Sequence, residues 1–170
     1  MMYAISVLVF DRGDRRFCYR VAAVILDNGR VLLQAVEEGP TFEAPFYCLP
    51  GGRVEHGEAA EECLRREMRE ELEDEVEVER LLWVMENFFE HEEMSWHEIG
   101  MYFLVSLPTG STLLTTEGPH YGAEPEAGIT FRLEWHDVGE LEGVRLLPSF
   151  LRTSLRDLPE RAEHIVHYGE

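Results

Sequence analysis

The sequence contains no lysine, since all 15 of its basic residues are arginine. This absence excludes covalent catalysis by a lysine nucleophile or through a lysine Schiff base. No run of roughly 18 or more apolar residues occurs, so no membrane-spanning helix is predicted and no membrane partner is expected. The apolar stretch Met1–Phe10 lacks both a basic leading segment and a small-residue cleavage site. It is predicted to form a first strand rather than a signal peptide.

Cysteine is scarce as well. The three cysteines, Cys18, Cys48 and Cys63, form no Cys-x-x-Cys pair. They are predicted to be free thiols, which indicates the reducing cytoplasm as the location of the protein.

Positive charge is in deficit, because 15 basic residues face 34 acidic ones for a formal net charge of −19. Binding to a nucleic-acid polymer is not expected, since affinity for its phosphates comes mostly from Lys and Arg. A small phosphorylated substrate is compatible with this charge if a divalent metal ion supplies the positive charge. The acidic residues are densest between Gly52 and Gly100, which hold 17 of the 34. This concentration indicates either a solvated surface or a metal site.

The length of 170 residues predicts one domain, residues 1–170, with a sizeable core. β-rich runs bounded by turn residues predict the strands Tyr3–Phe10, Phe17–Leu26, Val31–Val36, Phe46–Leu49, two stretches within Val76–Phe89, Trp96–Leu107 and Ile129–Trp135. Polar or Gly- and Pro-rich connections are predicted at Asp11–Asp14, Asp27–Gly29, Glu38–Pro45, Glu90–Met94 and Pro108–Ala127. The exposed edge of Tyr3–Phe10 leaves a homodimer through strand pairing open.

Two helices are predicted. The clearer one is Glu58–Leu72, which contains no Gly or Pro and consists mostly of good helix formers. The second is predicted to begin at Pro148, with an apolar stripe formed by Phe150, Leu151, Leu155 and Leu158. Strands on both sides of one central helix, followed by a C-terminal helix, predict an α+β fold with helices on both faces of a mixed β-sheet.

The central helix places three carboxylates beside its apolar side. At about 100° per residue, one arc holds Glu67, Glu70 and Glu71, and the adjoining arc holds Leu64, Met68 and Leu72. A solvated charged face usually lies opposite the apolar stripe, so this position puts the carboxylates at the rim of the buried surface. Their mutual repulsion of a few tenths of a kcal/mol per pair would be offset by a hard cation such as Mg²⁺. On the helix alone, a Glu-rich surface helix neutralised by Arg66 and Arg69 remains the alternative.

From Gly52 onward the sequence reads G-R-V-E-H-G-E-A-A-E-E-C-L-R-R-E-M-R-E-E-L-E-D. It resembles the signature of the Nudix hydrolase family, and the matching residues are Gly52, Glu58, Arg66, Glu67, Met68, Glu70 and Glu71. Weaker similarity extends roughly from Phe17 to Leu158. Within the box Gly52–Asp74, two positions depart from the family: Glu73 replaces a Gly, and Asp74 replaces an aliphatic residue. These departures leave the geometry of the helix end unpredicted.

The resemblance implies a Nudix-type αβα sandwich and a specific reaction. That reaction is hydrolysis of a diphosphate bond in a nucleoside diphosphate linked to another moiety, of the nucleotide-sugar, ADP-ribose or nucleoside triphosphate type. The implied cofactor is Mg²⁺, with Mn²⁺ as a substitute, and the implied partner is a small nucleotide substrate. The implied metal ligands are the Gly51 carbonyl and the carboxylates of Glu67, Glu70 and Glu71, which are also the implied catalytic groups. Glu58 and Arg66 would hold these groups in place.

The family often takes its general base from outside the box. The candidates are Glu92, Glu93 and Glu98, of which Glu98 is favoured; the neighbouring His97 is more often a structural residue. For substrate binding, Arg53 could reach a phosphate, and the rings able to stack on a base are Phe88, Phe89, Trp96 and Tyr102. The proline typical of ADP-ribose hydrolases is absent at its expected spacing. The tyrosine typical of dinucleoside polyphosphate hydrolases would fall near Phe89, where no Tyr occurs.

Two alternatives to an enzyme stay open. A catalytically silent Nudix-fold module that binds or senses a nucleotide is compatible with the changes at Glu73 and Asp74. A metal-free acidic interaction protein would have carboxylates that all face bulk water and would bind neither Mg²⁺ nor Mn²⁺.

Overall fold

Nine strands form one mixed sheet in the described residues, which are 7–37, 45–116, 118–124 and 129–169 of a computed structural model. The strands are β1 (Val9–Arg12), β2 (Arg15–Asp27), β3 (Arg30–Val36), β4 (Phe46–Cys48), β5 (Glu77–His91), β6 (Met94–Ser106), β7 (His120–Glu124), β8 (Ile129–Asp137) and β9 (Glu163–Tyr168). The helical segments are α1 (Ala60–Leu72), α2 (Thr112–Thr115), the 3₁₀ turn η1 (Leu141–Gly143) and α3 (Leu151–Ser154). None of the helices described is long and apolar enough to cross a membrane.

The strand order is β7-β8-β3-β2-β6-β5-β9, with β1 added beside β2 and β4 beside β3. Two neighbouring pairs are parallel, β2 with β6 and β5 with β9, and the other pairs are antiparallel. The parallel pairing of β2 with β6 extends from Arg15 opposite Ser95 to Ile25 opposite Val105. It therefore brings together residues that are about eighty positions apart in the sequence.

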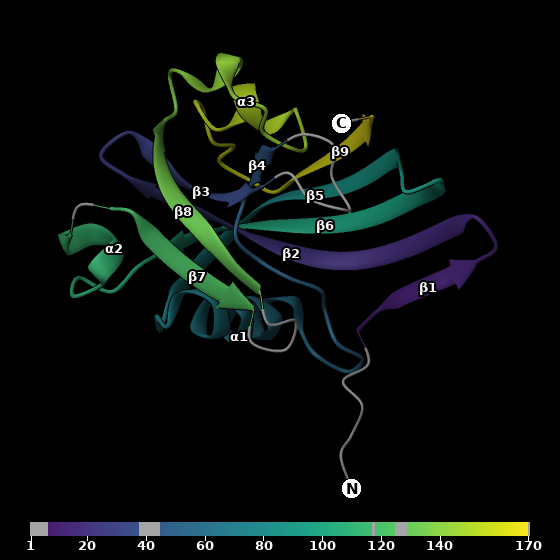
Figure 1. The fold of residues 1–170 in the computed structure, drawn as a ribbon, viewed down its shortest axis with the longest axis horizontal. Coiled ribbons are helices and arrows are strands. Elements are labelled where there is room, and N and C mark those ends of the chain that lie inside the picture. The colour runs from purple at the N-terminus through teal and green to yellow at the C-terminus, as the bar shows by residue number, and fades with distance from the viewer. Residues whose placement is uncertain (1–6, 38–44, 117, 125–128, 170) are drawn as a thin grey trace, which may run out of the picture.

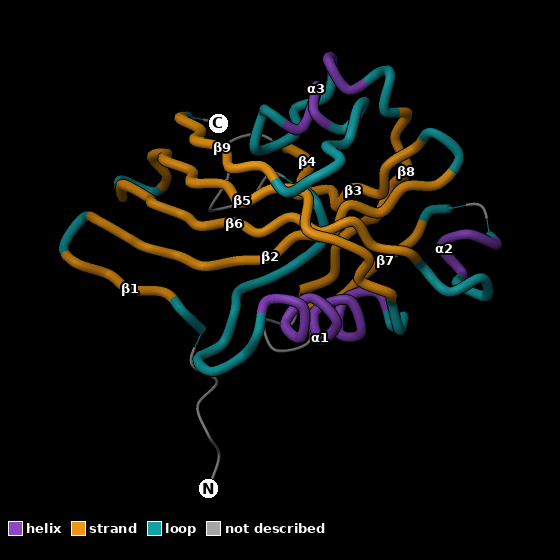
Figure 2. The backbone as a smooth tube through the Cα atoms, turned by 180° about the vertical axis from the view of Figure 1, so that it is seen from behind, coloured by secondary structure: helices purple, strands orange, loops and turns teal. Residues whose placement is uncertain are grey.

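Helical segments cover both faces of the sheet (Figure 1). Figure 2 shows the same layers from behind, with α1 on one side of the strands and α3 on the other. Side chains alternate between the faces of a strand, so β2 contributes Val21 and Ala23 to the α1 side and Ala22 and Val24 to the α3 side. Because both faces are covered, the middle of β2 is a continuous apolar run rather than an alternating one.

The predicted α+β sandwich with a mixed sheet is confirmed, and most predicted strands are present with shifted ends. β2 begins earlier than Phe17, and the first turn shrinks from Asp11–Asp14 to Gly13 and Asp14. Likewise, the predicted loop Glu90–Met94 reduces to a two-residue turn. The predicted strand Tyr3–Phe10 lies partly outside the described residues, and β1 ends at Arg12. The loop prediction Glu38–Pro45 falls almost entirely outside them.

The structure differs from the predictions at three places in the second half of the chain. The predicted loop Pro108–Ala127 contains both α2 and β7. The C-terminal helix is only four residues long, and the predicted stripe residues Leu155 and Leu158 lie beyond its end at Ser154. The third is β9, which was not predicted at all. Its sequence, EHIVHY, does not alternate strictly between polar and apolar residues, and the strand is defined by its pairing with β5.

Candidate active site

The loop from Pro50 to Val54 lies along β2 and positions the beginning of the site. The backbone amides of Ala23 and Val21 donate to the carbonyls of Pro50 (2.8 Å) and Gly52 (2.9 Å). Gly51 has a φ of +145°, and a Cβ at this position would lie 2.2 Å from the carbonyl oxygen of Val21. Gly51 is therefore required by the close approach of the loop to β2.

The carboxylate of Glu67, which projects from α1, lies directly over Gly52. A Cβ added to Gly52 would be 2.0 Å from Cδ of Glu67. Glu71 reaches the same loop one helical turn later, where the Gly51 amide donates to its Oε2 (3.1 Å). Both carboxylates are sheltered: the side chain of Glu67 is 13% exposed and residue Glu71 is 6% exposed. A metal-free interaction protein would leave these groups in bulk water, so their burial argues against that alternative.

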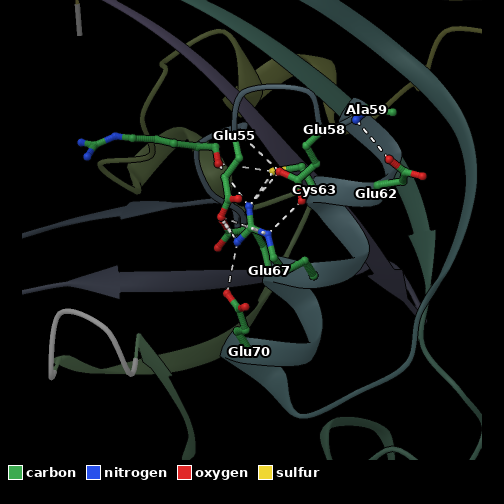
Figure 3. A network of polar contacts seen from close by, with 9 residues as sticks. Glu55, Glu58, Ala59, Glu62, Cys63, Glu67 and Glu70 are labelled. Atoms are coloured by element: carbon green, nitrogen blue, oxygen red, sulfur yellow. Dashed lines mark hydrogen bonds and ion pairs between the residues drawn. The ribbon is translucent and has the colours of Figure 1, made fainter. Parts of the chain in front are cut away.

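Arg66 links the carboxylates at the base of the site. Its guanidinium donates two hydrogen bonds to Glu58, from Nε to Oε1 (2.9 Å) and from Nη2 to Oε2 (3.0 Å). Nη1 donates to Oε1 of Glu67 (2.8 Å) and to Oε2 of Glu70 (3.2 Å). Figure 3 shows Glu55, Glu58, Glu67 and Glu70 converging from the loop before α1 and from the helix itself. These contacts raise the pKa of the Arg66 guanidinium, principally through its hydrogen bond with Glu58.

The chemical type of the ligand atoms suits a hard cation such as Mg²⁺. Glu67, Glu70 and Glu71 offer carboxylate oxygens beside backbone carbonyls, and hard cations prefer oxygen ligands. The glycine at position 52 leaves the space over the loop open for the Glu67 carboxylate, as such a site requires. Among residues 7–37, 45–116, 118–124 and 129–169, no three His, Cys, Asp or Glu side chains converge closely enough to hold a metal ion. Two of the three carboxylates are directed to Arg66 instead, so metal binding would require them to reorient.

The end of α1 keeps a left-handed residue although no glycine is present. Glu73 has φ 56° and ψ 24°, the conformation that a glycine cap would adopt without strain. The Asp74 carboxylate accepts a 2.6 Å hydrogen bond from the hydroxyl of Ser111, which begins α2. The two departures from the box thus leave the path of the chain after Leu72 in a usual C-cap geometry, and Asp74 ties it to α2.

A second group of charges lies on the α3 side of the sheet, next to the loop. Glu98 on β6 is 6% exposed, and burial raises the pKa of its carboxyl, an effect that the positive charges of Arg20 and Arg53 partly oppose. Burial likewise raises the pKa of the Cys48 thiol to about 11, and that thiol senses the charges of Arg20, Glu71 and Glu98. The Cys48 thiol is therefore close enough to both Glu71 on α1 and Glu98 on β6 to be affected by their charges.

Arg20 is the functional candidate that the sequence analysis missed. It lies on β2 opposite Arg53 in an isolated antiparallel bridge, diagonal to Glu98 across the β2–β6 pair. No hydrogen bond joins its guanidinium to any residue among those described. A half-buried arginine without such a partner is a natural anion site, because guanidinium matches phosphate geometry. The available signal was a single charge at the start of the apolar run Val21–Leu26.

The other candidate bases lie away from Glu98. Glu92 and Glu93 form the tip of the β5–β6 hairpin with positive φ values, about 17–20 Å along β6 from Glu98 at the rise of a strand. His97 points to the opposite face of the sheet, where its ring packs 4.3 Å from that of Phe88. Of the four candidates, the structure brings only Glu98 to the loop and the arginines.

The predicted substrate residues are divided between the two faces. Arg53 lies at the loop beside Arg20. Phe89 lies on the Glu98 face and stacks on Trp96 (5.4 Å), whereas Phe88 lies on the opposite face and stacks on Tyr168 (5.2 Å). Tyr102 is on the Glu98 face but is only 3% exposed. The structure does not bring Phe88 together with the site, and all of these roles remain predictions.

Comparisons with known proteins agree with this geometry. The family model of the NUDIX domain matches residues 16–158. The mouse (Mus musculus) protein 8-oxo-dGDP phosphatase NUDT18 is 32% identical over 152 residues, which are 86% of this chain and 44% of the mouse protein. The chain thus spans less than half the length of this curated relative.

Solved structures show the same fold. A NUDIX hydrolase from Nitrosomonas europaea has a TM-score of 0.56 at 16% identity, covering 90% of this chain and 79% of its own. A UDP-X diphosphatase has a TM-score of 0.54 at 19% identity, covering 97% of this chain and 69% of its own. The family match over residues 16–158 and the box at the Gly52 loop lead to one conclusion: this chain belongs to the Nudix hydrolase family of enzymes.

Proposed function

We propose that the protein is a divalent-metal-dependent hydrolase that cleaves the diphosphate bond of a nucleoside diphosphate linked to another moiety. The observation that carries the proposal is the meeting of two charge groups at the Gly51–Gly52 loop. The α1 carboxylates approach the loop from one side, and Glu98 with Arg20 and Arg53 from the other. A diphosphate requires both positive charge to bind it and a base to activate water.

The groups that would hold the metal are the carboxylates of Glu67, Glu70 and Glu71 and the Gly51 carbonyl. Mg²⁺ or Mn²⁺ bound there would neutralise charge on the diphosphate and polarise its P–O bonds. Arg66 and Glu58 would set the directions of these carboxylates, since Arg66 already contacts two of them.

The protein's own side chains would perform the remaining steps. The guanidinium groups of Arg20 and Arg53 would bind phosphate oxygens. The Glu98 carboxylate would accept the proton of the attacking water as its oxygen bonds to phosphorus. The bridging P–O bond would then break, releasing a nucleoside phosphate and the other phosphorylated half. The raised pKa of Glu98 suits this role, because a base is most effective when its pKa approaches the working pH.

The substrate class is the one that the family resemblance implies, and the charges of the site are compatible with it. The mouse relative's name specifies 8-oxo-dGDP, so we place this nucleotide in the first panel beside GDP, ADP-ribose, a UDP-sugar and nucleoside triphosphates. Cys18, Cys48 and Cys63 are free, which supports a reducing compartment such as the cytoplasm. A homodimer through the first strand remains a proposal.

The test is hydrolysis of this panel with Mg²⁺, with Mn²⁺ and with excess chelator, followed by phosphorus NMR of the products. We expect turnover of at least one nucleoside diphosphate derivative, abolished by the chelator and by Glu70→Gln. Glu61→Gln is the matched control, because Glu61 lies on the same helix but contacts only the exposed Arg65. Tight nucleotide binding without turnover of any member would instead indicate the silent module.

A further inference from the structure

A row of polar residues crosses three adjacent strands on the α3 side of the sheet. Glu98 on β6 lies opposite Asn87 on β5, and Asn87 lies opposite His167 on β9. Cross-strand partners of this kind have side chains on the same face, with Cβ atoms about 5 Å apart. The row therefore begins at the proposed base and runs away from the catalytic loop toward the C-terminal strand.

The carboxamide of Asn87 is held in one orientation. Its Oδ1 lies 2.8 Å from Nδ1 of His167, and Nε2 of His167 lies 3.1 Å from the Ser149 hydroxyl. Burial lowers the pKa of His167, which favours the neutral ring with a single N–H. An amide oxygen can only accept, so in the neutral ring Nδ1 donates to Asn87 and Nε2 accepts from Ser149. The β9 strand thus fixes which end of the Asn87 carboxamide faces His167.

The other end of this carboxamide has no hydrogen-bond partner among the residues that the structure describes. Asn87 is 6% exposed, yet no hydrogen bond joins its Nδ2 to any residue within the described ranges. Nδ2 is not fully enclosed either, because the one completely buried side-chain N or O atom without a partner in those ranges is Nε2 of His97. Buried amides in proteins are normally satisfied. The Nδ2 group of Asn87 carries two N–H donors, while Oδ1 of the same carboxamide is held by His167. Such a group is suited to bind an acceptor on a ligand.

The surroundings of Asn87 indicate which part of the substrate it would meet. The positive charges, Arg20 and Arg53, lie at the loop and would take the phosphates. Asn87 lies one strand beyond Glu98, with the His167 ring on its other side, and the Phe150 ring is 6.2 Å from His167 and 5.6 Å from Tyr102. Neutral donors and aromatic rings favour a nucleobase over a phosphate.

We propose that Asn87, oriented by His167, is a specificity-determining residue that donates from its carboxamide nitrogen to an oxo oxygen of the substrate's nucleobase. The inference rests on the proposed function and deepens it by specifying the class of base. Bases with an oxo group at the recognised position would be preferred over bases with an amino group there. An amino group would face the donor with another donor, which leaves both unsatisfied.

Inosine and adenosine nucleotides test this directly, because their bases carry an oxo and an amino group, respectively, at carbon 6. We would measure kcat/KM for IDP and ADP, and dissociation constants for their non-hydrolysable α,β-methylene analogues, in the wild-type protein and in variants. The wild type is expected to favour the inosine member by about tenfold or more. Asn87→Leu should bring the ratio close to one, and Asn87→Asp, which replaces the donor with an acceptor, should reverse it.

His167→Ala should reduce the preference several-fold, since the carboxamide of Asn87 could then rotate. His164→Ala is the matched control, because His164 lies on the same strand but faces the other side and contacts Glu86 (2.9 Å). Circular dichroism and melting curves would confirm that each variant folds, and His167→Ala carries the test if the Asn87 variants do not. An unchanged ratio in Asn87→Leu or His167→Ala, or a wild-type preference for adenosine, would overturn the inference. Absence of any turnover would overturn the proposed function alone, since the binding ratio still decides the role of Asn87.

Discussion

The carboxylate of Glu67 fills the space in which a side chain on Gly52 would stand, with 2.0 Å between Cδ of Glu67 and the position of that Cβ. Gly52→Ala would therefore displace Glu67 while leaving the fold intact, because the obstructing atoms are the end of a flexible side chain. We expect kcat/KM to fall by about a hundredfold with little change in Tm, since a misplacement of about 1 Å has this effect at an active site. Gly110→Ala is the control, as no atom lies within 4 Å of its added Cβ. Equal activity in the two variants would contradict the role of Glu67.

Arg66 and Arg65 are adjacent on α1 but differ in their contacts, which provides a matched pair. Arg66→Lys loses the paired bonds to Glu58 and the links to Glu67 and Glu70, because an ammonium cannot reproduce the fork of a guanidinium. We expect the free energy of unfolding to fall by about 2–3 kcal/mol. Arg65→Lys should change it by less than about 0.5 kcal/mol, since its bond to Glu61 is exposed.

Urea denaturation of both variants measures this difference, and assays of the same samples measure its effect on activity. A comparable loss in the two variants would show that Arg66 does not organise the site.

The pH dependence of kcat should report the buried Glu98. Its carboxyl must be ionised to accept a proton, and burial raises its pKa, so activity should fall on the acid side at a pH above the ordinary range of Glu. Arg20→Gln removes a positive charge that lowers this pKa, and the acid limb should then move to higher pH. Glu98→Gln should abolish the limb together with most of the activity. If hydrolysis persists in Glu98→Gln while Glu70→Gln is inactive, Glu98 is not the base.

The raised pKa of Glu98 also bears on stability. The ionised carboxylate that activity requires is the form that destabilises the folded protein. A carboxyl with a raised pKa in the folded state stabilises the fold below its unfolded pKa, and this stability is lost as the pH rises through the folded value. Wherever Glu98 is ionised in the folded protein, its buried charge therefore destabilises the fold. Glu98→Gln should raise the free energy of unfolding at pH 7 by about 1 kcal/mol, or roughly 2–4 °C in Tm. At pH 4 the difference should shrink, and a lower Tm at pH 7 would contradict the prediction.

Glu73 carries backbone strain that glycine would remove. Its φ of 56° lies in the left-handed region, which costs a non-glycine residue on the order of 1 kcal/mol. We expect Glu73→Gly to stabilise the protein by up to about 1 kcal/mol without changing kcat. Asn28→Gly is the control, because Asn28 has a φ of 48° but is a residue type that tolerates this region. Calorimetric melting of both variants would measure the gain, and a larger gain at Asn28 would contradict this reason.

Several elements could be predicted from the sequence because their causes are local. The box residues of α1 follow one another at helical spacing, so the arc of Glu67, Glu70 and Glu71 beside Leu64 and Met68 is evident from the order of residues alone. The β2–β3 hairpin is similarly marked by its own turn, Asn28-Gly29. The helix predicted from Pro148 is present but covers only Leu151–Ser154, because an apolar stripe does not show how far a helix extends.

The sequence by itself determined the family, the helix of the Nudix box and the carboxylates that this helix carries, because these depend on fixed offsets within a short segment. Only the tertiary structure decided which distant residues join them. Arg20 meets Glu98 through the parallel pairing of β2 with β6, and His167 meets Asn87 through that of β5 with β9. Such pairings are specified by side-chain packing across about eighty residues of chain, and no local periodicity records them.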